Sequence, residues 1–395
     1  MTVSVNKQDR KAVPVFLSVL GLLLLCGIFF ASSLAATMQG NCADCHTMHN
    51  SQNNVPMNYD NSTTPNESLT RASCFGCHAQ GGASPTVTVG SSVIPQVMHS
   101  SPVSLAAGNF GYITGMAGSG ASDSKGHNIA DLTGTDSVLY APPGGIVNVG
   151  GPSHVLGNTV NTTTLTCAGN NGCHGYRHYG SGGDTTYLVK GVTGAHHKNV
   201  DGQLLQATEP GNSYRFLMAV KGLESPDWQE NPSSSNHNEY YALPAPIQLG
   251  CTSPAVKCHE GPGGLTQPPD GTMSQFCATC HGNFHTLTTT ESDGVGAVAA
   301  SPFIRHPTDL SLPVTGEYAA YTVYNINAPV ARLAVPAVSS SVVTPGSDAV
   351  MCLSCHMAHA SNYPDMLRWD YDTMIAGNAG AAAGTGCFVC HSSKD

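Results

Sequence analysis

Cysteine and histidine recur together along this chain at a spacing that can attach a prosthetic group. The pattern Cys-x-x-Cys-His occurs five times, starting at positions 42, 74, 277, 352 and 387. Two thiols at this spacing form thioethers with the two vinyl groups of a haem, and the adjacent histidine is directed at the iron as its proximal ligand. The sequence therefore predicts five covalent haem c sites: Cys42, Cys45 and His46; Cys74, Cys77 and His78; Cys277, Cys280 and His281; Cys352, Cys355 and His356; Cys387, Cys390 and His391.

Four further cysteines lie in stretched versions of the same motif. Five or six residues separate the two cysteines, and histidine follows directly, in the sets Cys167, Cys173 and His174, and Cys251, Cys258 and His259. Disulfide loops are an alternative in an exported chain, and zinc is a weaker one because no fourth ligand stands nearby. We favour haem, which makes about seven haems in all. Of the 15 cysteines, only Cys26 then stays outside a motif.

The same sequence pattern occurs near both ends of the chain. Residues 42–51 and 352–361 both read C-x-x-C-H-x-x-H-x-S, and each is followed by C-F-x-C-H. This is an internal repeat. If each motif begins a short helix, the proximal histidine and the histidine three residues later lie on one helix face. We expect His49 and His359 to ligate a second haem close to the first.

Eighteen histidines exceed what seven proximal positions need, and the surplus can supply a second axial ligand to every iron. Methionine is an alternative ligand that would raise the potential, but the excess of histidine favours bis-histidine ligation. After the repeat histidines, the long loops between motifs offer the next candidates, His127, His154, His196 or His197, His237 and His306, with His99, His178 and His285 in reserve.

The doubled motifs carry a resemblance to a known family. A C-x-x-C-H-x-x-H pattern followed by a second motif resembles the doubled-CxxCH multihaem cytochromes c. The chain is similar to the large exported multihaem cytochromes of metal-reducing bacteria, some of which polymerise into conductive extracellular filaments. The similar stretches are residues 42–54, 71–77, 277–285, 305–312 and 352–369. The resemblance implies electron transfer, with filament formation as a further expectation.

The composition predicts an unusual fold. Charged residues make up 10% of the chain, aromatic residues 7%, and 44 glycines and 25 prolines interrupt regular structure. We expect mostly coil, with short helices at the haem motifs and few strands. Residues 85–93 alternate as a strand does, and residues 318–330 are also strand-like. The porphyrins would take the place of an aliphatic core, so folding should depend on haem attachment.

The first residues have the features of a signal peptide. Lys7, Arg10 and Lys11 precede an apolar run over 13–30, and small residues follow over 31–36. Cleavage there would remove Cys26 and send the protein to the cell surface or outside, with the periplasm and an uncleaved anchor as alternatives. We divide the chain into a signal peptide (1–36), an N-terminal haem module (37–160), a central haem region (161–300) and a C-terminal doubled module (301–395).

Three classes of function are compatible with this chain to different degrees. An electron carrier with bis-histidine haems explains the cysteines and the histidine surplus. A multihaem reductase needs one iron with an exchangeable position, often marked by Cys-x-x-Cys-Lys, which does not occur here. A purely structural surface protein leaves the haems unexplained. The net charge of −10 excludes nucleic acid held by a basic surface. Expected partners are other copies of the chain, redox cytochromes and extracellular electron acceptors, with no membrane span after cleavage of the signal.

Overall fold

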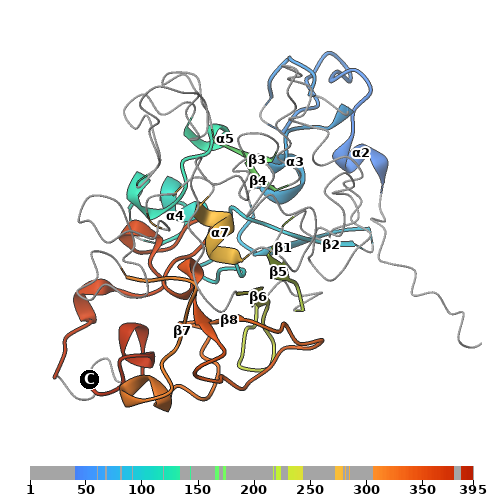
Figure 1. Cartoon of the computed structure of the whole chain (residues 1–395). Coiled ribbons are helices and arrows are strands. Elements are labelled where there is room, and N and C mark those ends of the chain that lie inside the picture. Colours follow the sequence, from blue (N-terminus) through green and yellow to red (C-terminus); the bar gives the residue numbers. More distant parts are fainter. Residues whose placement is uncertain are drawn as a thin grey trace, which may run out of the picture. The chain divides into compact units, whose positions relative to one another are not determined.

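Short elements joined by irregular chain make up the structure, as the density of glycine and proline predicts (Figure 1). The computed structural model describes residues 41–59, 61–66, 69–80, 82–90, 92–118, 120–133, 143, 165–168, 172–174, 217, 219–223, 230–242, 272–278, 281, 284, 306–377 and 384–394. The expected signal peptide and part of the central region lie outside these residues. Residues Met38–Asp395 form one compact unit, and the expected division of this unit into three haem regions stays a prediction.

The helices are single turns or little more. The α-helices are α2 (Cys42–Cys45), α3 (Phe75–His78), α4 (Gly111–Thr114), α5 (Ala130–Thr133) and α7 (Met273–Ala278). The 3-10 helices are η2 (Asp123–Lys125), η6 (Gly316–Ala320), η7 (Cys352–Ser354), η8 (Pro364–Met366), η9 (Tyr371–Thr373) and η10 (Gly386–Val389). Among the described helices, none is long and apolar enough to cross a membrane.

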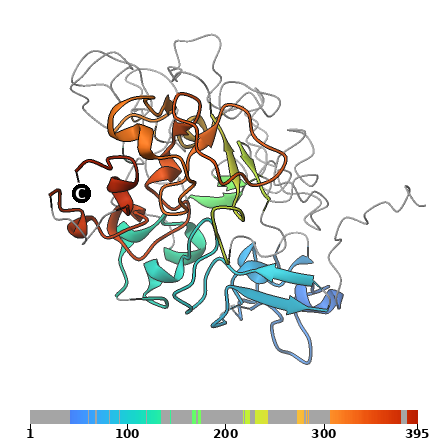
Figure 2. The same ribbon diagram turned by 90° about the horizontal axis from the view of Figure 1, so that it is seen from below.

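The strands are equally short and form three small sheets. They are β1 (Thr86–Val89), β2 (Ser92–Pro95), β3 (Thr166–Ala168), β4 (Gly172–His174), β5 (Val220–Lys221), β6 (Glu239–Tyr241), β7 (Leu310–Ser311), β8 (Ala331–Arg332) and β9 (Ala349–Val350). β1 and β2 form an antiparallel hairpin, visible as the pair of blue arrows in Figure 2. β3 pairs with β4 in parallel, and the third sheet has the order β5-β6-β8-β9-β7.

Two expectations about strands need correction. Residues 85–93 do not form one strand but turn back at Gly90, whose positive φ of 61° is easily adopted by glycine. Residues 318–330 are not a strand either: η6 occupies their start. The hydroxyl of Tyr321 donates to the carbonyl of Ala328 at 2.6 Å, and the side chain of Asn325 accepts from the amide of Asn327 at 2.9 Å. These local bonds close a turn after Tyr324, and the segment pairs with another part of the chain only at an isolated antiparallel bridge between Val323 and Val342.

Buried apolar side chains gather in three small clusters among the described residues. One lies around the third sheet and includes Val220, Tyr240 and Met351. The second contains Tyr321, Tyr324, Val330 and Val389. The third joins residues far apart in sequence. Such small clusters agree with a chain that organises itself around bound groups.

Candidate haem sites

The described regular motifs close into the same turn. In each, the histidine amide donates to the carbonyl of the first cysteine four residues before it, at 2.8 Å for His46, 3.0 Å for His78, 3.1 Å for His281, 3.1 Å for His356 and 2.9 Å for His391. One helical turn thus brings the two cysteines and the histidine to one side of the chain. This is the local structure that an attached haem requires.

The internal repeat extends from sequence to hydrogen bonds. In the N-terminal module His46 forms an antiparallel bridge with Thr70, and in the C-terminal module His356 does so with Leu367. The residue after each bridge partner is an arginine, Arg71 or Arg368. Its amide donates to the carbonyl of the second cysteine of the motif at 2.9 Å in both modules. The two modules therefore share a three-dimensional framework as well as a sequence pattern.

This framework corrects the expected helix face. α2 ends at Cys45, and His46 is already extended with φ −117° and ψ 153°. In the C-terminal module η7 ends at Ser354. Because the bridge pulls each proximal histidine into extended pairing, the histidine three residues later does not lie one helical turn above it.

Backbone carbonyls hold the Nδ1 atoms of several candidate ligands. The acceptors are the carbonyls of Pro95 for His78 (2.9 Å), Ala358 for His127 (2.7 Å), Pro143 for His281 (2.7 Å), Pro307 for His306 (3.0 Å) and Asp365 for His356 (2.7 Å). A carbonyl can only accept, so each Nδ1 carries the proton and each Nε2 keeps its lone pair in the neutral ring. This tautomer is the one that binds iron through Nε2.

Burial keeps four of these rings neutral. Desolvation lowers the pKa of His78, His281 and His306, and it lowers the pKa of His127 to about 4. A neutral imidazole needs no deprotonation before it binds a metal. The donor set and its protonation state therefore fit haem iron.

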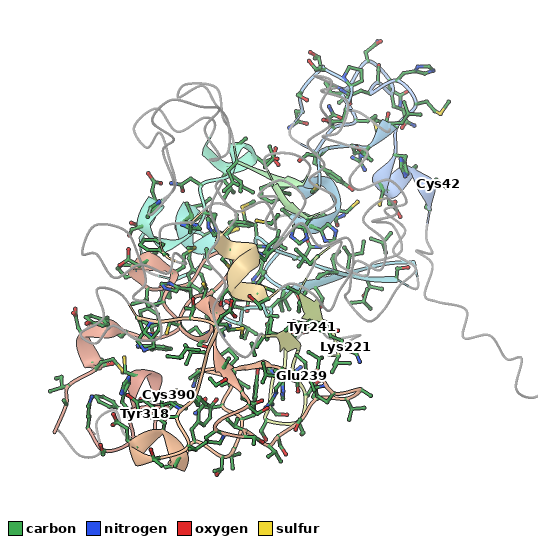
Figure 3. The ribbon with its side chains drawn as sticks, in the orientation of Figure 1. Cys42, Lys221, Glu239, Tyr241, Tyr318 and Cys390 are labelled. Carbon is green, nitrogen blue, oxygen red and sulfur yellow. The ribbon has the colours of Figure 1, made fainter. Side chains whose placement is uncertain are left out.

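His391 differs because its Nδ1 faces a carboxylate. The distance from Nδ1 to Oε1 of Glu317 is 3.1 Å, and the hydroxyl of Ser393 donates to Oε2 at 2.9 Å. The hydrogen bond with His391, together with Ser393 and the charge of Lys394, lowers the pKa of Glu317 to about 2. A charged acceptor makes the imidazole a stronger electron donor than a neutral carbonyl does. Figure 3 shows Tyr318 and Cys390, which flank this site.

Three pairs of histidine rings lie at nearly one separation. The ring centres are 6.0 Å apart for His127 and His281, 6.1 Å for His174 and His359, and 6.2 Å for His306 and His391. Each pair joins a predicted proximal histidine to a predicted distal one. Two metal–nitrogen bonds of roughly 2 Å, plus about 1 Å from each nitrogen to its ring centre, also give about 6 Å. The spacing fits one iron between two rings.

His237 departs from the prediction that it is a distal ligand. Its ring is fully buried, its Nδ1 lies 3.0 Å from the carbonyl of Ser233, and its Nε2 lies 3.1 Å from Oε1 of Glu239. The ring also stacks on Tyr324 with centres 3.6 Å apart. Both nitrogens are engaged within the protein, so His237 as placed offers none to iron. The loop context that suggested a ligand gave no sign of the carboxylate two residues away acting as its partner.

His99, held in reserve from the sequence, has the features of a ligand. Its ring is fully buried and its Nε2 has no hydrogen-bond partner. The side chain of Asn109 fixes the local backbone by accepting from the amide of His99 at 3.1 Å and donating to its carbonyl at 2.9 Å. A buried nitrogen without a partner is costly, and a metal would satisfy it. The sequence signal is slight, since nothing near His99 in the chain marks it.

The first stretched motif lies beside the second regular motif. Cys167 and Cys173 stand on β3 and β4, with Thr166 opposite Gly172 in the parallel pair, and no disulfide joins the two cysteines. The Cys167 thiol hydrogen-bonds with that of Cys74, and this contact, with burial, raises the pKa of Cys167. Cys167 also lies within 3.9 Å of a carboxylate oxygen of Asp131.

Thiols of other motifs also meet. Cys45 and Cys77 form a side-chain hydrogen bond, and burial followed by the Cys45 charge raises the pKa of Cys77 to about 12. In the C-terminal module, burial and then the charges of Cys387 and Cys390 raise the pKa of Cys355. Among the described residues, no group of three or more metal-ligating side chains forms a separate metal site.

Several predicted site residues lie outside the described part of the chain. They are Cys251, Cys258, His259, Cys280, His154, His196 and His197, together with the reserve candidates His178 and His285. The second stretched motif is among them.

Known proteins share the doubled motifs of this chain. The doubled CXXCH motif family matches residues 35–83 and 344–395, which contain the two modules. The chain carries doubled CxxCH motifs near both ends, and these motifs support covalently bound haem c. It is 26% identical to C-type cytochrome OmcS of Geobacter sulfurreducens over 403 residues, covering 91% of this chain and 86% of that protein.

Two solved structures are also similar. One is the outer membrane cytochrome S filament from Geobacter sulfurreducens, with 20% identity and a TM-score of 0.40. The other is the cryo-EM structure of the OmcS nanowires from the same organism, with 21% identity and a TM-score of 0.41. Each alignment covers 88% of this chain and 88% of the other.

Proposed function

We propose that this cytochrome carries electrons along about seven covalently attached haems, each held between two histidines. The observation that carries the proposal is the common separation of 6.0–6.2 Å in the three histidine pairs. The proposed axial pairs are His281 with His127, His174 with His359, and His391 with His306. His99 joins the remaining distal candidates, and His237 leaves them.

Haem iron, when bound, supplies one-electron chemistry by alternating between its ferric and ferrous states. The chain's own residues decide what else can happen. Two histidines per iron leave no position for a substrate, which favours electron transfer over catalysis. The carbonyls that accept from Nδ1 keep each ring in one tautomer and one orientation. The group that accepts from Nδ1 tunes the redox potential of the individual haem. It is a carbonyl for His281 and a carboxylate for His391.

Contacts between motifs give a proposed order of neighbours. Cys45 meets Cys77, and Cys74 meets Cys167, which makes the first three motifs consecutive. His174 of the third motif pairs with His359, which follows the motif of His356. Besides burial, the charges of the Cys387 and Cys390 thiols raise the pKa of Cys355, which supports a position of the last motif near that of His356 in the proposed order. The haem at His281 adjoins this row through His127, whose Nδ1 is bonded to the carbonyl of Ala358.

Intact mass and magnetic spectroscopy of the haem-loaded protein test the proposal. We expect the mass of seven haems and a resting state dominated by low-spin ferric iron. A mass corresponding to five haems would assign the stretched motifs to another role. A large high-spin fraction would favour the alternative of a multihaem reductase with one open iron.

We also propose that the protein is exported and that copies associate end to end into a filament. Modules near both ends of the sequence could place haems at both contact surfaces, and only 10% of residues are charged, which lowers the cost of burying surface between subunits. The N-terminal module exposes Met48, Val55 and Leu69, with 73%, 55% and 49% of their surface accessible. The side chain of His49 is exposed. It is thus available as a ligand to a haem of a second copy.

Electron microscopy of the surface fraction at native expression tests this second part. Open filaments are expected, since a head-to-tail contact that does not close continues indefinitely. Monomers or closed oligomers of fully loaded protein would leave a soluble electron carrier, exchanging with redox cytochromes or extracellular acceptors.

A further inference from the structure

Two arginines occupy equivalent places in the two modules. Arg71 and Arg368 each follow the residue that bridges to the proximal histidine, and each donates its amide to the second cysteine of the motif. Their side chains start alike as well. Nε of Arg71 donates to the carbonyl of Met57 at 2.6 Å, and Nε of Arg368 donates to the carbonyl of Leu353 at 2.7 Å. Each arginine is therefore held through its backbone amide at a haem-attachment cysteine and through its Nε at a second carbonyl.

Neither guanidinium has a carboxylate partner in the described structure. Arg368 adds a bond from Nη1 to the carbonyl of Ile326 at 3.3 Å, and the ionisable groups around it are the phenols of Tyr240, Tyr321 and Tyr324 and the thiol of Cys355. Burial among them lowers the pKa of Arg368. Arg71 lies over the ring of Tyr59, with 4.3 Å from its Cζ to the ring centre. Carbonyls and rings orient these cations but do not neutralise them.

A third arginine, Arg332, does have carboxylate partners for its guanidinium. Nε of Arg332 donates to Oε2 of Glu239 at 2.9 Å, and its Nη1 donates to a carboxylate oxygen of Asp348. Although burial lowers it, these two carboxylates raise the pKa of Arg332 above its usual value. Among the described residues, no carboxylate pairs with Arg71 or Arg368 in this way. A guanidinium partly withdrawn from water without a counter-charge is destabilised, so an anionic partner would stabilise each of these half-buried arginines.

We propose that Arg71 and Arg368 each bind a propionate carboxylate of the haem attached through Cys45 or Cys355. The inference rests on the proposed function, since it requires haem at these motifs. With Nε committed to a carbonyl, the two Nη groups remain as a planar fork, which matches a carboxylate. The backbone amide of each arginine donates a hydrogen bond to the carbonyl of the thioether cysteine, so the arginine lies next to the attachment point in both modules. The same arrangement in both modules argues for a shared ligand.

The test is a pH titration of haem potentials in full-length, haem-loaded Arg368→Gln and Arg71→Gln variants. A cation beside a carboxylate lowers its pKa by about 1–3 units. We therefore expect each variant to move the pH-dependent step of one haem potential upward by about one pH unit or more. At neutral pH that potential should become more negative. Lys221→Met removes a charge bound to the carbonyl of Pro336, away from the motifs, and should leave every step in place.

Further measurements keep the inference falsifiable if a glutamine variant loads haem poorly. Arg368→Lys and Arg71→Lys keep the charge and lose the fork, so they should shift the step by less than glutamine does. In the unmodified protein, resonance Raman bands should show two haems whose propionate stays ionised below pH of about 4. Titration steps unchanged in loaded variants, or ordinary propionate titration at every haem of the unmodified protein, would overturn the proposal. Neither result depends on the spin state, which tests the proposed function separately.

Discussion

The two doubled modules share their residues and their hydrogen-bond framework, yet their second histidines meet different surroundings. His49 of the N-terminal module is exposed. His359 of the C-terminal module is half-buried, stacks on Phe110 with ring centres 4.7 Å apart, and donates its amide to the carbonyl of Ala107 at 2.6 Å. The motif therefore fixes the attachment turn, whereas the segment packed against it decides what the second histidine can reach.

Two glycines make the close packing around His359 possible. A Cβ added at Gly108 would lie 1.9 Å from the carbonyl oxygen of Ala360. One added at Gly126 would lie 2.5 Å from the Cβ of Ala360 and 2.7 Å from the carbonyl oxygen of His359. Real Cβ atoms do not approach so closely, so both positions require glycine. The chain at Gly108 and at Gly126 can therefore approach the backbone of the C-terminal module closely.

The largest expected effect comes from His359→Ala. If His359 is the distal ligand opposite His174, the variant should convert one low-spin iron into a high-spin or weakly ligated form. His49→Ala is the matched control from the other module. In isolated single copies it should leave the low-spin count unchanged, and it should lower that count only in assembled protein. Equal loss in isolated copies of both variants would erase the distinction between the modules.

Replacing Gly126 by alanine should lower the stability of the protein by disrupting the packing on the C-terminal module only. Gly126→Ala forces overlap with Ala360 and His359, and overpacking of this kind costs about 1–3 kcal/mol. Gly82→Ala is the control near the N-terminal module, because the nearest atom to its added Cβ, at 3.8 Å, is the amide of Ser84. Denaturant unfolding of the loaded proteins measures both. A Gly126→Ala variant as stable as its control would contradict the described packing.

A smaller effect is expected from Glu317→Gln. The second proximal histidine of the C-terminal module, His391, faces this carboxylate, whereas its N-terminal counterpart His78 faces the carbonyl of Pro95. Loss of the charged acceptor should raise the potential of one haem by about 60 mV, the equivalent of about 1.4 kcal/mol for one electron. Spectroelectrochemistry resolves the shift. A fall in potential, or no change, would remove Glu317 from the haem site.

His237, outside both modules, should have the least effect on the irons. His237→Ala should leave the low-spin count unchanged, because both ring nitrogens are bonded within the protein. It should lower the free energy of unfolding by about 1–3 kcal/mol, since Glu239 loses a buried partner. His306→Ala, read by the same spectra, is the contrasting variant. Loss of a low-spin iron in His237→Ala would restore His237 as a ligand.

The sequence was sufficient for what depends on local spacing and insufficient for what depends on packing. The attachment motifs, the repeat and the scarcity of regular structure follow from spacing and composition. The bridges that pull His46 and His356 out of helical geometry depend on partners at Thr70 and Leu367, which no periodicity marks. For the same reason, His237 was expected to be a distal ligand and His99 only a reserve, whereas the packing favours the opposite. One has a carboxylate partner, and the other is buried without one.

Magnetic circular dichroism of the fully loaded ferric protein tests the central claim most directly, because it counts low-spin and high-spin haems in one sample. Bis-histidine ligation predicts that every haem is low-spin and that the signal has the signature of two imidazoles. One or more high-spin irons per chain in the intact, assembled protein would contradict the account and point to a haem with an open position.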